Sequence, residues 1–426
     1  MFDSTIVEFS SYSGVEASTS MNTAIFIIFS IIFVASSTIL LNSVRKTTYA
    51  SKSPPLGLGY FHGTISGTQI LTVTIIVVII FQMLLLNEYN LVLLKIQTYL
   101  SHLSALVFLS YLVFLFNRWL TSKRNYTIIL YTISLSLVSL NLVVSLIYLE
   151  SYLDSAPLPI VKPYPIVSYV TNFGGVVFSE SLSTVFDALS VCSFLLMWIA
   201  TAILLSQYRH KMGRIKYFSL MSIPLLYYIF PFQSYFGDVF FSLLPSSPVS
   251  FSIIYVLIFS ATKQVGALLF GLAFWTASSL IHDERIRKSL LMSSIGIVIL
   301  FGSIEIAPLQ YHVYPPYGLV TEAFIPLGAY LLFVGIFISA KNISRDAEVR
   351  KEFYKNAESQ LTLLKTIGVS QMERELESQV KSVEKRSKLL ERTDVPDLEE
   401  EDIKEILHDV LTELYYSKGK TVAQKS

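Results

Sequence analysis

Four ionisable side chains inside apolar stretches are the residues of this sequence that could do chemistry. They are Asp187, Lys263, Glu305 and Glu322. A charge within a bilayer is costly, so such residues usually pair with one another or mark the path of a ligand or ion. At 1.5 Å rise per residue, all four lie roughly 23–27 Å from the same end of their helices. Their shared depth predicts a charged cluster that opens outward, with His312 in the loop just above it.

Three interpretations of this charged cluster stay open. Lys263 could pair with Glu305 or extend toward the interface, while Glu322 and Asp187 sit at helix starts, where the helix dipole favours a carboxylate. The residues could instead line an outward-facing site for a ligand or ion. They could also relay protons or ions across the membrane.

Other kinds of chemistry are not indicated. The sequence has no HExxH, GxSxG or protein-kinase motif set, so we expect no enzyme activity and no catalytic residue. Its six histidines are scattered singly and Cys192 is the one cysteine, which excludes a Cys-based zinc site and an internal disulfide. We therefore expect neither a metal nor a cofactor. No basic patch interleaved with aromatic residues points to a nucleic-acid partner.

The composition is that of a polytopic membrane protein. Hydrophobic residues make up 53% of the 426 residues and charged residues only 15%, with a mean hydropathy of +0.57. A crossing helix needs about 20 mostly apolar residues. Nine such runs predict an all-α bundle embedded in membrane lipid: Thr23–Leu41, Thr68–Leu86, Leu100–Phe116, Tyr126–Leu149, Val185–Leu205, Tyr217–Phe232, Val249–Ile281, Leu290–Ile306 and Leu319–Ala340.

Basic residues between these runs predict the orientation. The loops after runs one, three, five and seven are rich in Lys and Arg, whereas the alternate loops contain only Lys95 and Lys162. The positive-inside rule then puts the N-terminus outside and the C-terminus in the cytoplasm of a cell-membrane protein. We expect an extracellular segment at 1–22, the bundle at 23–340, a cytoplasmic tail at 341–416 and a disordered end at 417–426.

Two runs and one loop are irregular. The sixth run is short and contains Pro224 and Pro231, so a re-entrant hairpin is the alternative to a full crossing. The seventh would reach about 50 Å as a helix, so either its outer part projects from the membrane or the span begins near Lys263. The proline-rich loop 150–184 is either a lid over an outer cavity or a surface segment.

Half of the 32 Lys and Arg residues follow Ala340, in a segment that favours helices. We expect one helix to continue from the last span to Ile367 and end at Gly368, and a second to open with a capping box at Ser370. Heptad spacing in the second helix predicts either a homodimeric coiled coil or packing within the chain. The residues that carry it are Val369, Leu376, Val383 and Leu390.

A third tail helix is predicted after Pro396. Its apolar stripe needs a partner, which is either the rest of the tail or a cytoplasmic protein. The stripe includes Ile403, Leu407, Val410 and Leu414.

The segment Arg345–Arg386 (RDAEVRKEFYKNAESQLTLLKTIGVSQMERELESQVKSVEKR) resembles the tails of uncharacterised polytopic membrane proteins of archaea. The whole layout also resembles the membrane half of a sensor kinase without its kinase. The sequence thus predicts a receptor-like, non-catalytic signal transducer that couples an outer polar cavity to the tail. A channel or secondary transporter is one alternative, and an accessory subunit of a membrane complex is another.

Overall fold

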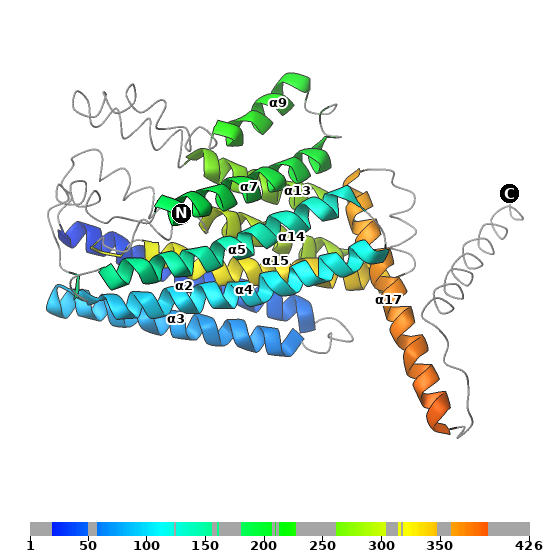
Figure 1. The fold of residues 1–426 in the computed structure, drawn as a ribbon, viewed down its shortest axis with the longest axis horizontal. Coiled ribbons are helices and arrows are strands. Elements are labelled where there is room, and N and C mark those ends of the chain that lie inside the picture. Colours follow the sequence, from blue (N-terminus) through cyan, green and yellow to red (C-terminus); the bar gives the residue numbers. More distant parts are fainter. Residues whose placement is uncertain are drawn as a thin grey trace, which may run out of the picture.

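The computed structural model describes residues 19–49, 58–122, 125–155, 160–161, 180–206, 209, 213–226, 261–303, 314–316, 318–346 and 359–390. These residues are almost entirely helical, which confirms the all-α prediction (Figure 1). The helices are α2 (Thr19–Tyr49), α3 (Leu58–Leu86), α4 (Leu91–Ser122), α5 (Tyr126–Ser155), α7 (Glu180–Leu205), α9 (Arg214–Ser222), α13 (Ala261–Ser279), α14 (Glu284–Ser303), α15 (Gly318–Arg345) and α17 (Ser359–Leu390). Two short strands, β1 (Tyr89–Asn90) and β2 (Ile160–Val161), pair antiparallel.

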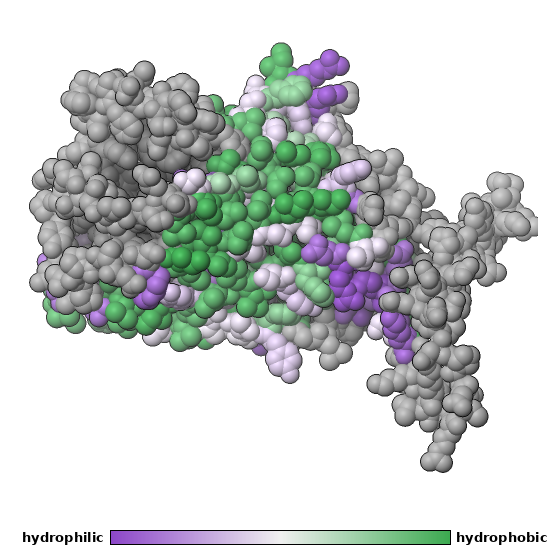
Figure 2. Space-filling view, viewed as in Figure 1, coloured by the Kyte–Doolittle hydropathy of each residue, from purple (hydrophilic) through white to green (hydrophobic). Residues whose placement is uncertain are grey.

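Seven of the described helices are long and apolar enough to cross a membrane: α2, α3, α4, α5, α7, α14 and α15. They run side by side in one bundle, and apolar side chains cover its flank (Figures 1 and 2). Large exposed hydrophobic residues such as Ile31, Ile70 and Leu85 would contact water in a soluble protein, but they suit contact with lipid. The multi-pass membrane character is therefore supported, whereas the count of nine spans stays a prediction.

The sixth and seventh predicted runs are described only in part. Helix α9 packs on α7, because Trp198 Nε1 donates to Met221 O at 2.9 Å and Tyr217 Oη donates to Ala202 O at 3.1 Å. This order of contacts makes α9 antiparallel to α7. A short 3₁₀ turn that contains Pro224 follows it. The described part of the seventh run is α13, which begins at Ala261.

Helix α15 is the central element of the bundle. It packs against α14, α4, α2 and α3 along its length and against α17 at its end. Most of its residues are buried, including polar Thr321, Glu322 and Ser339. A spanning helix so fully enclosed by protein has little contact with lipid, so its polar residues must be satisfied by neighbouring helices.

Glycines allow α14 and α15 to approach closely. A Cβ added at Gly328 would lie 2.8 Å from the backbone N of Leu300, and one at Gly296 would overlap the backbone N of Leu332. Neither backbone can move aside without shifting a helix. Small residues of this kind bring membrane helices into van der Waals contact, which is a main source of their association.

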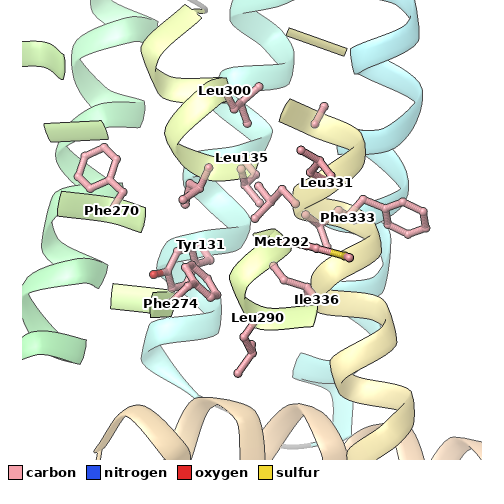
Figure 3. Packing of buried hydrophobic residues seen from close by; sticks show 14 of the residues in the cluster. Tyr131, Leu135, Phe270, Phe274, Leu290, Met292, Leu300, Leu331, Phe333 and Ile336 are labelled. Atoms are coloured by element: carbon pink, nitrogen blue, oxygen red, sulfur yellow. The ribbon is translucent and has the colours of Figure 1, made fainter. Parts of the chain in front are cut away.

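The apolar core extends from α14 to its neighbours on both sides. Leu290, Met292 and Leu300 of α14 lie between the aromatic residues of α13 and the aliphatic residues of α15 (Figure 3). Phe270 packs edge-to-face against Phe301 at a centroid distance of 5.1 Å. This core follows α14 along its length, and a smaller apolar cluster that includes Phe26, Phe33, Tyr89 and Tyr314 fills the end of the bundle away from α17.

The tail helix α17 lies across one end of the bundle (Figure 1). Trp119 Nε1 near the end of α4 donates to Gln371 Oε1 at 3.3 Å, and Asn125 Nδ2 just before α5 donates to Thr366 Oγ1 at 3.2 Å. Arg345 at the end of α15 forms an ion pair with Glu375 at 3.5 Å. The end of α4, the start of α5 and the end of α15 therefore meet at the same side as α17.

The structure corrects two boundaries of the predicted tail. Helix α15 ends at Arg345 and Asp346 is not helical, so the last span does not run unbroken to Ile367. Helix α17 instead continues through Gly368, which was predicted to end a helix. The reason is packing: a Cβ at Gly368 would overlap Ile343 Cγ2, so glycine serves close contact rather than a turn. Ser370 Oγ donates to Trp119 O at 3.4 Å and does not cap a helix.

The start of the third span is also different from the prediction. Helix α4 begins at Leu91, not at Leu100. A tight turn with Asn87 at φ 54° separates it from α3. Asn90 Oδ1 accepts a hydrogen bond from the Val92 amide at 2.8 Å, which caps the helix in place of a missing intrahelical partner. The span therefore includes polar residues that the hydropathy pattern assigned to a loop.

Candidate functional site

Buried polar residues meet where α3, α4 and α15 come together. None of them is more than 7% exposed, although each lies in a helix long enough to span a membrane. We call this group the core polar cluster: Thr68, Gln69 and Thr72 of α3, Gln97, Thr98, Ser101, His102 and Ser104 of α4, and Thr321 and Glu322 of α15. Such a concentration of polar atoms in a bundle interior is expensive unless hydrogen bonds satisfy it, so its contacts indicate what the site can do.

Helical spacing explains how α4 supplies half of the cluster. Side chains three or four residues apart lie on one face of a helix. This spacing relates Gln97 to Ser101, and Thr98 to both Ser101 and His102. On α3, Gln69 and Thr72 are likewise three residues apart. The two polar faces point at each other and at the N-terminal half of α15.

Glu322 is the acidic member of the cluster and is only 2% exposed. Its Oε2 accepts a hydrogen bond of 2.7 Å from Thr98 Oγ1. His102 Nδ1 lies 2.9 Å from the backbone carbonyl of the same threonine. A carbonyl oxygen only accepts hydrogen bonds, so Nδ1 must carry the proton and donate it. Thr98 thus links the two ionisable side chains of the cluster.

Amide side chains join the three helices around Glu322. Gln97 Nε2 donates to Thr72 Oγ1 at 3.1 Å and to Ser101 Oγ at 2.8 Å. Gln69 Nε2 donates to the backbone oxygen of Ala323, the neighbour of Glu322, at 3.4 Å. These bonds connect α3 to α4 and α3 to α15, so a change at Glu322 would disturb all three helices.

Three buried atoms of the cluster have no hydrogen-bond partner: Gln69 Oε1, Gln97 Oε1 and His102 Nε2. The two oxygens are acceptors. In neutral His102 the proton is on Nδ1, so Nε2 is an acceptor as well. The cluster therefore has more acceptors than donors. Such an imbalance suits a group that brings positive charge or protons.

A proline removes one backbone hydrogen bond of α15 about one turn after Glu322. Pro326 lies inside the helix and has no backbone N–H, so it cannot donate the usual helical hydrogen bond to the carbonyl of Glu322 four residues earlier. The helix runs through Pro326 without a break, but it lacks one backbone hydrogen bond at this point. The backbone around Glu322 is consequently less constrained by its own helix than the rest of α15.

Aromatic residues cover the cluster at the end of the bundle away from α17. The rings of Tyr89 and Tyr314 stack at a centroid distance of 6.1 Å. Tyr314 Oη donates to Asn87 Oδ1 at 3.2 Å, and burial raises the pKa of its phenol. The β1–β2 pairing holds Ile160–Val161, near the start of the predicted lid, against the same turn. An opening from the cluster at this end would require these residues to move.

A second polar contact ties α4 to α5 near this end. Lys95 Nζ lies 2.8 Å from Glu150 Oε1, and Tyr99 Oη donates to Glu150 Oε2 at 2.7 Å. These hydrogen bonds, from Lys95 first and Tyr99 second, lower the pKa of the Glu150 carboxyl. Lys95 was predicted to lie in a loop, but it belongs to α4.

The predicted site residues are distributed differently from the expectation. Glu322 lies in the core polar cluster. Asp187 is instead exposed on α7, a helix that packs mainly against α5 and α13. Lys263 lies in the first turn of α13, and Glu305 and His312 lie outside the described residues.

The predicted tail positions also fall into groups. Val369 is buried within the chain itself at 4% exposure, and Leu376 is half-buried. Both favour packing within the chain over a coiled coil at the start of the heptad pattern. Val383 and Leu390 lie farther along α17, where the homodimer stays a prediction. The stripe Ile403, Leu407, Val410 and Leu414 lies outside the described residues.

Sequence reasoning missed most of the core polar cluster. The missed signal was the polar run at Gln97, Thr98, Ser101 and His102: the first two fell in the predicted loop, and His102 was counted only as one of six scattered histidines. Within the described ranges, no group of three or more His, Cys, Asp or Glu side chains could hold a metal ion.

Comparisons with protein-family models, with curated proteins and with solved structures find no match for this chain. The resemblance of the tail to archaeal membrane proteins stays a prediction.

Proposed function

We propose that this protein is a receptor-like, non-catalytic membrane sensor in which α15 couples the core polar cluster to the tail helix α17. The observation that carries the proposal is the position of α15. Its first half contributes Glu322 to the cluster, and its last turns contact α17. One buried helix thus touches both the residues most able to respond to a ligand and the segment most able to report it.

The inner part of α15 is suited to move as a unit. Glu322 and Arg345 are separated by about 35 Å of helix. Between them Gly328 and Gly335 pack tightly on α14. Because close-packed interfaces tend to have discrete arrangements rather than to deform continuously, a displacement at Glu322 would be carried along the helix.

The contact between α15 and α17 is specific enough to report such a displacement. Gly368 lies directly on Ile343, and Arg345 pairs with Glu375. Leu363, Leu364 and Ile367 bury their side chains in the same region. A shift of α15 relative to α4 would therefore strain the docking of α17 on both helices.

The orientation belongs to the same proposal, with the N-terminus outside and α17 in the cytoplasm. Basic residues at the α17 end of the bundle support it, among them Arg118, Arg285, Lys288 and Arg345. Cytoplasmic loops of membrane proteins are enriched in such residues. Docked in this way, α17 would present its far half to a cytoplasmic partner or to a second copy of the chain.

Trp119 offers a test, because its indole nitrogen contacts Gln371 of the docked tail. Replacing Trp198 and Trp275 by Phe leaves Trp119 as the one tryptophan of the full-length chain. In nanodiscs, we expect Glu322→Gln to increase the quenching of Trp119 by acrylamide, since the tail would dock less tightly. Asn141→Leu, which removes a buried amide of α5 outside the cluster, is the matched control and should leave quenching unchanged. Equal quenching of the Glu322→Gln and parent proteins would contradict the coupling.

A secondary transporter is the second candidate. It is favoured by the buried carboxylate of Glu322, four residues before Pro326 in a helix that could cross a membrane. Reconstituted vesicles with an imposed sodium or proton gradient would distinguish the two functions. Ion flux that is lost in Glu322→Gln would favour transport, whereas a response of Trp119 without flux would favour the sensor.

A further inference from the structure

We infer that the core polar cluster binds one univalent metal cation, with Glu322, Gln69 and Gln97 as oxygen ligands. The inference names a ligand class for the site of the proposed function, but it rests on the cluster alone and not on coupling to the tail.

The unpartnered atoms provide the first argument. Gln69 and Gln97 are 4% and 0% exposed, and the carbonyl oxygen of each side-chain amide has no hydrogen-bond partner. The orientation of the Gln69 amide is fixed, because its nitrogen faces the carbonyl of Ala323, which can only accept. A buried amide oxygen left in this state costs about 1–3 kcal/mol. A bound cation removes that cost at both glutamines.

Connectivity provides the second argument. A hydrogen bond joins Gln69 to Ala323, the residue after Glu322 in the sequence. Another joins Glu322 to Thr98, the residue after Gln97. Gln97 bonds to Thr72, three residues after Gln69 on the same helix face. These hydrogen bonds connect α3, α4 and α15 in a ring. The two amide oxygens and the carboxylate are therefore held around one region of the bundle interior.

Ligand chemistry and charge select the ion. Carboxylate, amide and hydroxyl oxygens suit hard cations, whereas transition metals prefer several His and Cys ligands, of which the cluster has only His102. The cluster contains a single carboxylate and no Lys or Arg. One univalent ion neutralises that carboxylate, whereas a divalent ion would leave a net positive charge in a low-dielectric interior. A sodium ion is the natural probe.

Thermal unfolding of the full-length protein in nanodiscs tests the inference. At equal ionic strength, we expect the Tm to be about 2–5 °C higher in sodium chloride than in choline chloride, because an ion that binds the folded state stabilises it. Repeating the Tm measurement in lithium chloride and in potassium chloride compares alkali ions of different size. Glu322→Gln and Gln69→Leu should lose the shift, whereas Asn141→Leu should keep it. Equilibrium binding of radioactive sodium to the same samples should give about one site per chain.

Several results would overturn the inference. These are an identical Tm in all four chlorides, a shift that persists in Glu322→Gln, or a Glu322-dependent shift in calcium chloride only. The outcomes also separate the two proposals. A sodium shift without any change in Trp119 quenching supports the ion site and rejects the coupling. A change in Trp119 quenching in Glu322→Gln without a sodium shift does the opposite.

Discussion

The two sides of α15 are built from different chemistry. Toward α14 it presents glycine and aliphatic residues, and the helix backbones touch at Gly296 and Gly328. Toward α3 and α4 it presents the Glu322 carboxylate and the backbone oxygen of Ala323, which accept hydrogen bonds from the Thr98 hydroxyl and the Gln69 amide. The first side is dry and dominated by shape. The second depends on hydrogen bonds whose number changes with protonation or ligand binding.

This difference suggests a division of tasks within one helix. Close packing of backbones resists small adjustments, because interiors are packed as densely as organic crystals. A polar network with unpartnered acceptors has instead an incomplete set of interactions and gains energy when a donor or cation arrives. The α14 side would therefore keep α15 in register, and the α3–α4 side would decide which register is favoured.

The largest effect on stability is expected when the close contact between α14 and α15 is disrupted. Gly296→Ala places a Cβ on the backbone N of Leu332, and no side-chain rotation relieves that overlap. We expect a loss of about 3 kcal/mol or more in stability, measured as a fall in Tm or in resistance to denaturant. Gly63→Ala in α3 is the matched control, because nothing lies within 4 Å of its added Cβ. That variant should be neutral or gain up to about 1 kcal/mol.

A smaller effect is expected on the polar side. Gln97→Leu keeps the volume but leaves the hydroxyls of Thr72 and Ser101 without their shared donor. We expect a loss of about 1–3 kcal/mol. Adding Thr72→Val to Gln97→Leu should cost less than the sum of the two single changes, since both remove the same bond. Strict additivity in unfolding experiments would contradict the hydrogen-bonded network.

The contrast between the two sides also explains what the sequence could reveal. Apolar runs predicted the helices of the bundle because hydropathy is a property of each segment alone. The core polar cluster depends instead on three helices that are distant in the sequence. Glu322 was recognised because a carboxylate in a span is conspicuous, whereas Gln69 and Thr72 look like ordinary polar residues of an apolar helix until α4 is placed against them.

Two local rules misled the prediction for physical reasons. Lys95 and Gln97 reduced the hydropathy at the start of α4, so the helix was placed nine residues too late and its polar face was lost. Gly368 carries the usual signal for a helix end, but its tertiary contact with Ile343 decides the outcome. In both cases, packing against a distant helix outweighs the local pattern.

Weakening the contact between the bundle and its tail should have a moderate effect. Trp119→Phe keeps the aromatic packing but removes the donor to Gln371 Oε1. We expect a cost of about 1 kcal/mol, localised to α17 and visible as several-fold faster limited proteolysis of that helix. Trp275→Phe, at an exposed position on α13, is the control and should leave proteolysis unchanged. A fall in global Tm without faster cleavage would indicate that Trp119 serves the bundle and not the tail.

The smallest effect is expected at the exposed contact between α4 and α5, and its pH dependence follows from the lowered pKa of Glu150. A carboxyl whose pKa is lower in the folded state stabilises that state above its usual pKa and loses this contribution as the pH falls through the lowered value. The Tm difference between the natural protein and Glu150→Gln should thus be present at pH 7 and shrink progressively as the pH falls below about 4, the usual pKa of a glutamic acid. It should also shrink at high salt, because Lys95 and Glu150 are both partly exposed to solvent. A difference that stays constant from pH 7 to pH 3 would mean that the negative charge of Glu150 contributes nothing, and the charge of Lys95 would then be irrelevant to the pairing of α4 with α5.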